Sequence, residues 1–137
     1  MAKSVKTFEI INAYNALNKL KLSKLNNEEV LSLLRAKKTM RPVVKAYQEF
    51  ESDARESVKP ANFEELVAKA QAKEQLSMEE QALLLDIDKR LNAMLIEEAG
   101  KENEWSQEPL SEELLVKLFT ECELETKDED YLYFLFE

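Results

Sequence analysis

Carboxylates are the most abundant side chains of this sequence that could act as general acids or bases. They occur side by side as Glu97-Glu98, Glu112-Glu113 and Asp128-Glu129-Asp130. Neighbours in sequence point to different faces of a helix, so these carboxylates do not converge on one substrate. The second and third sets also lie at predicted helix starts, where the helix dipole favours negative charge. We interpret them as helix-stabilising residues rather than as a catalytic pair.

The residues that other kinds of catalytic or metal-binding site require are missing from the sequence. The sequence has no histidine, which excludes Ser-His-Asp and Cys-His centres and His-bearing zinc sites. The lone Cys122 lies between Glu121 and Glu123, whose negative charge should raise the pKa of the thiol. A single glycine cannot build a GxGxxG motif or a P-loop, and residues 128–130 lack the spacing of a calcium-binding loop. The sequence therefore predicts a protein that is not an enzyme and uses no cofactor, metal or small-molecule substrate.

Positive charge is concentrated in one stretch of predicted helix, where five cations fall within 11 residues: Arg35, Lys37, Lys38, Arg41 and Lys45. Such a face could contact the phosphates of a nucleic acid. The alternative is a solvated face, or one that attracts the acidic part of the chain. Residues 1–60 carry 12 basic and 7 acidic side chains, residues 61–137 carry 7 and 21, and the net charge is −9. Because the chain is acidic and shows no recognition-helix motif, nucleic-acid binding is our second hypothesis.

Aromatic residues gather near the end of the sequence. Five of the 11 aromatics are Trp105, Tyr131, Tyr133, Phe134 and Phe136. If exposed, they would form an adhesive surface for a partner protein, because aromatic side chains are enriched at the centres of interfaces. If buried, they would form a small second core. The sequence leaves both interpretations open.

The element that must organise these residues is a long amphipathic helix over residues 26–58. Apolar residues recur there every three or four positions, which keeps one side of a helix facing a partner. Asn26 and Glu29 have the spacing of a capping box at its start. At 1.5 Å per residue it would be about 45–50 Å long, and so needs another long helix against it. Pro42 lies inside this helix and predicts either a kink or a break.

Shorter helices are predicted over residues 7–21, 62–70, 77–99 and 111–119. Capping-box spacing also occurs at three further pairs: Asn62 with Glu65, Ser77 with Glu80, and Thr126 with Glu129. Residues 101–109 are predicted to be a polar loop. Residues 131–136 could be helix or strand, and we favour helix; a short strand within residues 4–11 is a further alternative.

These elements predict an all-α fold: a long antiparallel helical hairpin of residues 26–58 against 77–99, with an N-terminal helix and a small C-terminal helical cap. Residues 1–100 are expected to form a helical bundle and residues 101–137 the cap packed on it, within a single domain. Because the long helix overhangs, we expect a homodimer. The sequence shows no membrane-spanning run and no signal peptide, which favours a cytoplasmic protein with no membrane partner.

Three motifs follow one another in an order that resembles small uncharacterised helical proteins encoded by bacteriophages and prophages. They are INAYNALNKL at residues 11–20, YQEFE at residues 47–51 and EPLSEEL at residues 108–114. The resemblance supplies no catalytic residues and implies an accessory or assembly role in a mobile element. Our first hypothesis is therefore a non-enzymatic protein-binding or assembly protein. The alternative is a nucleic-acid-associated accessory protein that uses the basic face of residues 35–45.

Overall fold

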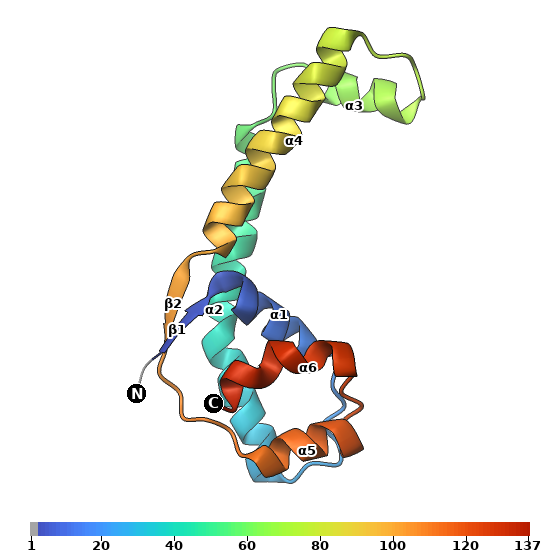
Figure 1. The fold of residues 1–137 in the computed structure, drawn as a ribbon. Coiled ribbons are helices and arrows are strands. Elements are labelled where there is room, and N and C mark those ends of the chain that lie inside the picture. Colours follow the sequence, from blue (N-terminus) through green and yellow to red (C-terminus); the bar gives the residue numbers. More distant parts are fainter. Residues whose placement is uncertain (1–2) are drawn as a thin grey trace. The chain divides into compact units, whose positions relative to one another are not determined.

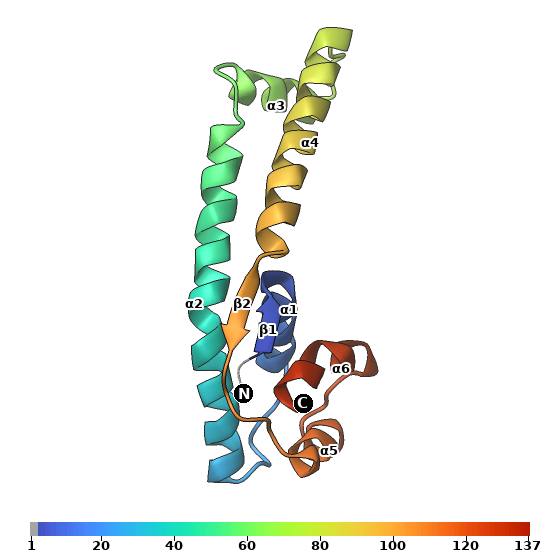
Figure 2. The same cartoon turned by 60° about the vertical axis from the view of Figure 1, so that its left-hand side comes forward.

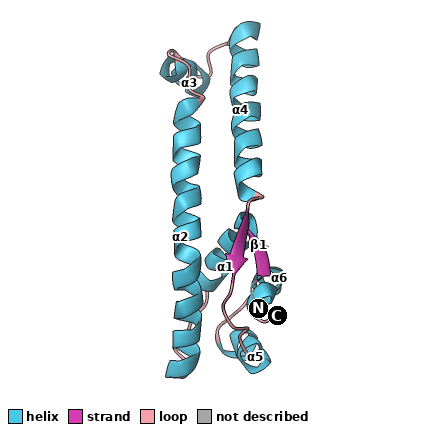
Figure 3. Cartoon of the chain, turned by 90° about the vertical axis from the view of Figure 1, so that its left-hand side faces the viewer, coloured by secondary structure: helices cyan, strands magenta, loops and turns pink. Residues whose placement is uncertain are grey.

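A computed structural model describes residues 3–137 of the chain and is built mostly of α-helices (Figures 1 and 3). In chain order the elements are β1 (Lys3–Lys6), α1 (Thr7–Asn18), α2 (Asn27–Ser57), α3 (Phe63–Gln71), α4 (Met78–Ala99), β2 (Glu102–Trp105), α5 (Glu112–Glu121), α6 (Thr126–Leu132) and the 3₁₀-helix η1 (Tyr133–Leu135). The predicted all-α class is confirmed, with one small two-stranded sheet in addition.

The chain divides into two compact units, and α2 contributes to both. The first unit holds the residues up to Tyr47 together with Ala99–Glu137, and the second holds Gln48–Glu98. Residues 101–137, predicted to be a cap on residues 1–100, therefore group with the first 47 residues. The predicted bundle is divided at residue 48.

Helix α2 begins at the predicted capping box. The backbone N–H of Glu29 donates to Asn26 Oδ1 at 2.9 Å, and the N–H of Asn26 donates to Glu29 Oε1 at 3.0 Å. The helix continues without interruption through Pro42, whose ring is exposed. A proline on the outer side of a helix costs a hydrogen bond but does not disturb the packed side. The alternative of a broken helix is therefore wrong.

The first unit contains a strand pair that local patterns did not predict in full. Strands β1 and β2 are antiparallel, with Val5 opposite Asn103, and lie side by side in Figures 1 and 3. The Asn103 amide donates to the Val5 carbonyl at 3.2 Å and to Thr7 Oγ1 at 2.9 Å. The alternative of a short strand near the N-terminus is confirmed. The prediction of a loop throughout residues 101–109 is wrong, because this pairing joins residues almost 100 positions apart.

The core of the first unit forms where α1, the first part of α2, α5, α6 and η1 meet. Its most deeply buried large side chains are Ile10, Leu33, Met40, Leu118, Cys122, Leu132 and Leu135. The end of the chain is helical, as we favoured, because α6 passes directly into η1.

The second unit is a helical hairpin closed by α3. The last turns of α2 run beside α4 (Figure 2) and pack through Ala54 and Val58 against Ile87 and Leu91. Helix α4 begins at a capping box in which Glu80 N–H donates to Ser77 Oγ at 3.1 Å. The predicted hairpin is therefore present, formed by the last part of α2.

Candidate functional site

Two side chains with catalytic potential, Cys122 and Asp128, are buried in the first unit. Cys122 is fully buried, and burial, followed by the charges of Glu121 and Glu29, raises the pKa of its thiol. Asp128 is buried and accepts a hydrogen bond from Lys19 Nζ at 3.3 Å, which ties α6 to α1. Within residues 3–137, no group of three or more His, Cys, Asp and Glu side chains is arranged to hold a metal ion. None of the helices in this range is long and apolar enough to cross a membrane.

The five predicted cations all lie on α2 within the first unit, and we call them the α2 basic face. They are Arg35, Lys37, Lys38, Arg41 and Lys45. All are exposed except Lys37, which is half-buried. At 100° per residue they cover about half of the helix circumference, next to the side that packs into the core.

The α2 basic face differs from the rest of the first unit in its ion pairs. Elsewhere in this unit lysines pair with carboxylates, as in Lys117–Glu29 at 2.8 Å and Lys21–Glu123 at 3.0 Å. None of the five cations on the α2 basic face has a carboxylate oxygen within 4 Å among residues 3–137. No ion pair within the described chain therefore neutralises these five cations directly.

One cation of the face is held in place. Arg41 Nε donates a hydrogen bond to Tyr14 Oη at 3.3 Å, across from α1. This hydrogen bond is the main reason why the pKa of the Tyr14 hydroxyl is lowered. This hydrogen bond restricts the orientation of the Arg41 guanidinium, and an oriented guanidinium loses less conformational freedom when it binds a carboxylate or phosphate.

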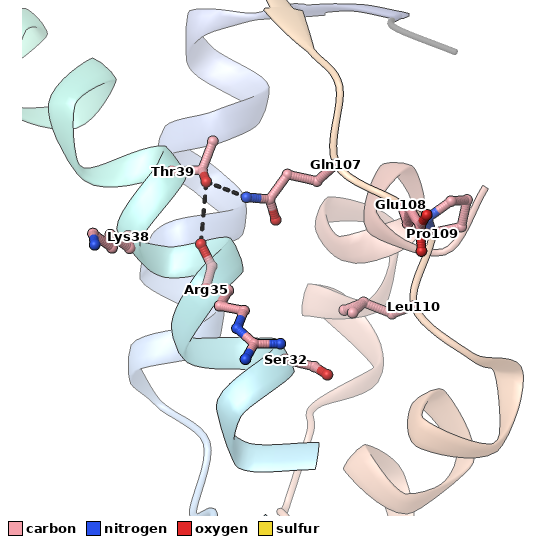
Figure 4. Close-up of a pocket in the computed structure, with 8 residues that line it drawn as sticks. All are labelled: Ser32, Arg35, Lys38, Thr39, Gln107, Glu108, Pro109 and Leu110. Carbon is pink, nitrogen blue, oxygen red and sulfur yellow. Dashed lines mark hydrogen bonds between the residues drawn. The ribbon is translucent and has the colours of Figure 1, made fainter. Parts of the chain in front are cut away.

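A polar pocket of about 460 Å³ adjoins the basic face, between α2 and the loop that follows β2 (Figure 4). Gln107 donates to Thr39 Oγ1, and Thr39 Oγ1 donates to the Arg35 carbonyl at 3.1 Å. The Arg35 side chain extends between Ser32 and Leu110 in Figure 4. Since Arg35 belongs both to this pocket and to the basic face, the two form one continuous surface.

Sequence reasoning missed two apolar residues beside these cations. Leu31 and Leu34 are 47% and 45% exposed. They continue the line of Lys38, Arg41 and Lys45 with spacings of three and four residues. The outward line of alternating three- and four-residue steps was the signal in the sequence that could have identified them.

The predicted aromatic cluster is divided between the core and the surface. Trp105 is 3% exposed and makes an edge-to-face contact with Phe134, with ring centroids 5.3 Å apart. Phe134 and Phe136 are half-buried against the same core. Tyr131 and Tyr133 are exposed. The interpretation as a buried core therefore holds for Trp105, while Tyr131 and Tyr133 are 42% and 39% exposed.

Comparisons with models of protein families, with curated proteins and with solved structures found no match. Function is therefore inferred from the geometry of this chain.

Proposed function

We propose that this chain is a non-enzymatic protein-binding or assembly protein, and that its partner docks on the α2 basic face through an acidic segment. The observation that carries this proposal is the set of five cations without an ion pair in the described chain, beside Leu31 and Leu34. A surface that served only for solubility would need no exposed leucines next to unneutralised charge.

The two kinds of side chain would contribute differently to binding. Exposed ion pairs contribute about 0.2–1 kcal/mol each, so the cations would mainly select an acidic partner and speed its encounter. Burial of Leu31 and Leu34 would supply contact area at about 25 cal/mol per Å². An acidic amphipathic helix offers both carboxylates and an apolar edge, and it is therefore the partner chemistry that fits this surface.

Nucleic-acid binding is the second candidate, because the same five cations fall within 11 residues of one helix. One feature favours a protein instead. The face carries leucines where a binder of single strands would carry aromatic side chains for stacking.

The resemblance to small helical proteins of bacteriophages and prophages supports an accessory or assembly role in a mobile element. We place this role in the cytoplasm, where an acidic chain with one cysteine and no disulfide would function.

The test is affinity capture of the tagged protein from its native host, with and without nuclease, read by mass spectrometry. We expect a defined acidic partner that survives nuclease and is lost from the double variant Lys38→Glu, Arg41→Glu. The matched control is Lys21→Glu, Lys24→Glu, which makes the same charge change outside the basic face and should retain the partner. Recovery that collapses on nuclease treatment would instead support the nucleic-acid alternative. Equal loss from both double variants would contradict a specific site.

A further inference from the structure

A cavity of about 400 Å³ lies in the first unit, where α1, α6 and η1 meet, and we call it the aromatic cavity. Its volume is in the range of small-molecule sites. Four aromatic side chains line it: Phe8, Tyr131, Tyr133 and Phe134. The first three are exposed, although large rings are usually covered by the core that they adjoin. These rings are therefore accessible to a ligand.

The charged part of this lining is negative. It consists of Glu9, Asp130 and Glu137, and among residues 3–137 no lysine or arginine lines the cavity. Within the same range, these carboxylates are not arranged as a group that could hold a metal ion. Aromatic rings attract organic cations placed over their faces, and carboxylates add the opposite charge. The composition of the aromatic cavity therefore suits an organic ammonium group rather than a metal ion.

The chain itself places one ammonium group beside two residues of this lining. Lys3 Nζ lies 5.9 Å from the centroid of the Phe134 ring and 3.9 Å from a carboxylate oxygen of Glu137. It also donates a hydrogen bond to the Phe134 carbonyl. A ring and a carboxylate of the aromatic cavity are therefore already seen to hold an ammonium group.

The other part of the lining offers the same kinds of group without a cation. Within residues 3–137, no lysine or arginine lies over the rings of Phe8, Tyr131 or Tyr133. Asp130 is exposed and has no ion-pair partner in that range. These three rings and Asp130 therefore lack the ammonium group that Phe134 and Glu137 receive from Lys3.

We infer that the aromatic cavity binds an alkylated ammonium group, such as the trimethylammonium group of a small amine or of a methylated lysine side chain. The methyl groups contact the rings of Phe8, Tyr131 and Tyr133, and the positive charge faces Asp130. An alkylated ammonium group has the size to contact several rings at once, which a bare inorganic cation lacks. None of the cations of the α2 basic face lines this cavity, so the inference goes beyond the proposed function.

Titration of the full chain with choline, followed in amide NMR spectra, tests the inference. We expect saturable shifts around the aromatic cavity, and about tenfold weaker binding of dimethylbutanol, the uncharged isostere of choline in which carbon replaces nitrogen. Tyr131→Leu and Asp130→Asn should each weaken choline binding about threefold. Both residues are exposed, so the far-UV circular dichroism spectrum should not change. The matched control Asp53→Asn removes the same charge from an exposed position of the second unit and should bind choline normally.

A peptide that carries one trimethylated lysine distinguishes the two sources of the ammonium group. Tighter binding of the peptide than of choline would assign the site to a protein side chain, and the reverse order would assign it to a free amine. Equal binding of choline and dimethylbutanol would overturn the inference, because the charge would then contribute nothing. It would also be overturned if neither choline nor the peptide bound saturably, or if Tyr131→Leu and Asp130→Asn both left choline binding unchanged. The double variant Lys38→Glu, Arg41→Glu should still bind choline, which separates this site from the α2 basic face.

Discussion

The two units of this chain differ in how their helices are held. In the first unit, seventeen described residues are buried in one core, which also receives a strand pair and an ion pair to the buried Asp128. The core cluster of the second unit has four buried residues, contributed by α2 and α4, and Leu66 of α3 is buried outside that cluster. Since burial of apolar surface is the main stabilising term, the second unit should open at a lower free energy than the first.

The largest expected effect comes from the first core. Leu118→Ala should lower the free energy of unfolding of the first unit by about 2–5 kcal/mol, because Leu118 is fully buried and a cavity would remain. Trp105 is the only tryptophan and is buried in this unit, so its fluorescence in a denaturant titration measures the effect.

The matched change in the second unit sharpens the comparison. Leu91→Ala should shift only the early part of the transition seen by circular dichroism, and leave the Trp105 transition within about 0.5 kcal/mol. If Leu91→Ala moved the Trp105 transition as far as Leu118→Ala does, the two units would unfold as one and the comparison would fail.

A smaller effect is expected at the start of α4. Ser77→Ala removes the hydroxyl that accepts from Glu80 N–H, and should destabilise the second unit by about 1 kcal/mol. Asn62 precedes α3 but its side chain makes no capping hydrogen bond. Asn62→Ala should therefore change stability by less than about 0.5 kcal/mol. Equal effects in circular-dichroism melts would show that the hydrogen bond at Ser77 contributes nothing.

The smallest effect is a pH dependence confined to the first unit. Burial raises the pKa of Cys122, so above about pH 8.5 the unfolded thiol loses its proton while the folded thiol keeps it. The unfolded state then binds fewer protons, and this thiol's contribution to stability, complete at lower pH, falls as pH rises through that range. Cys122→Ala should remove this part of the slope in the Trp105 transition. A slope unchanged by the substitution would assign the dependence to other groups.

Local sequence signals predicted the helices well. They predicted the capping interactions at the helix starts correctly in some cases and wrongly in others. Asn26 with Glu29 and Ser77 with Glu80 form the expected reciprocal bonds. A cap residue needs an extended backbone, whereas Asn62 has φ −100° and ψ 18°, and makes no such bond.

The same signature fails at Thr126 for a different reason. Helix α6 begins one residue earlier than predicted, with Glu125 at the cap position. Residue spacing alone therefore does not determine whether the backbone can form the cap.

Local sequence patterns could not predict features that depend on contacts between residues far apart in the sequence. The strand Glu102–Trp105 exists because Lys3–Lys6 lies beside it, and four residues have no strand periodicity of their own. The α2 basic face was identified from its charges. The sequence did not predict that its cations would form no ion pair with a carboxylate. For Trp105 the sequence left both a contact surface and a buried core open, because composition alone cannot distinguish an adhesive aromatic from a core aromatic.

Because the chain divides at residues 48 and 98, the two units are completed at different times during synthesis. The second unit is continuous in sequence, so a ribosome finishes all of its parts before any of α5 or α6 is made. The first unit begins earlier but must wait for Leu118, Leu132 and Leu135 before its core can close. Because distant contacts also form slowly, α1 and the start of α2 expose apolar surface throughout that interval, when a nascent chain is most open to chaperones.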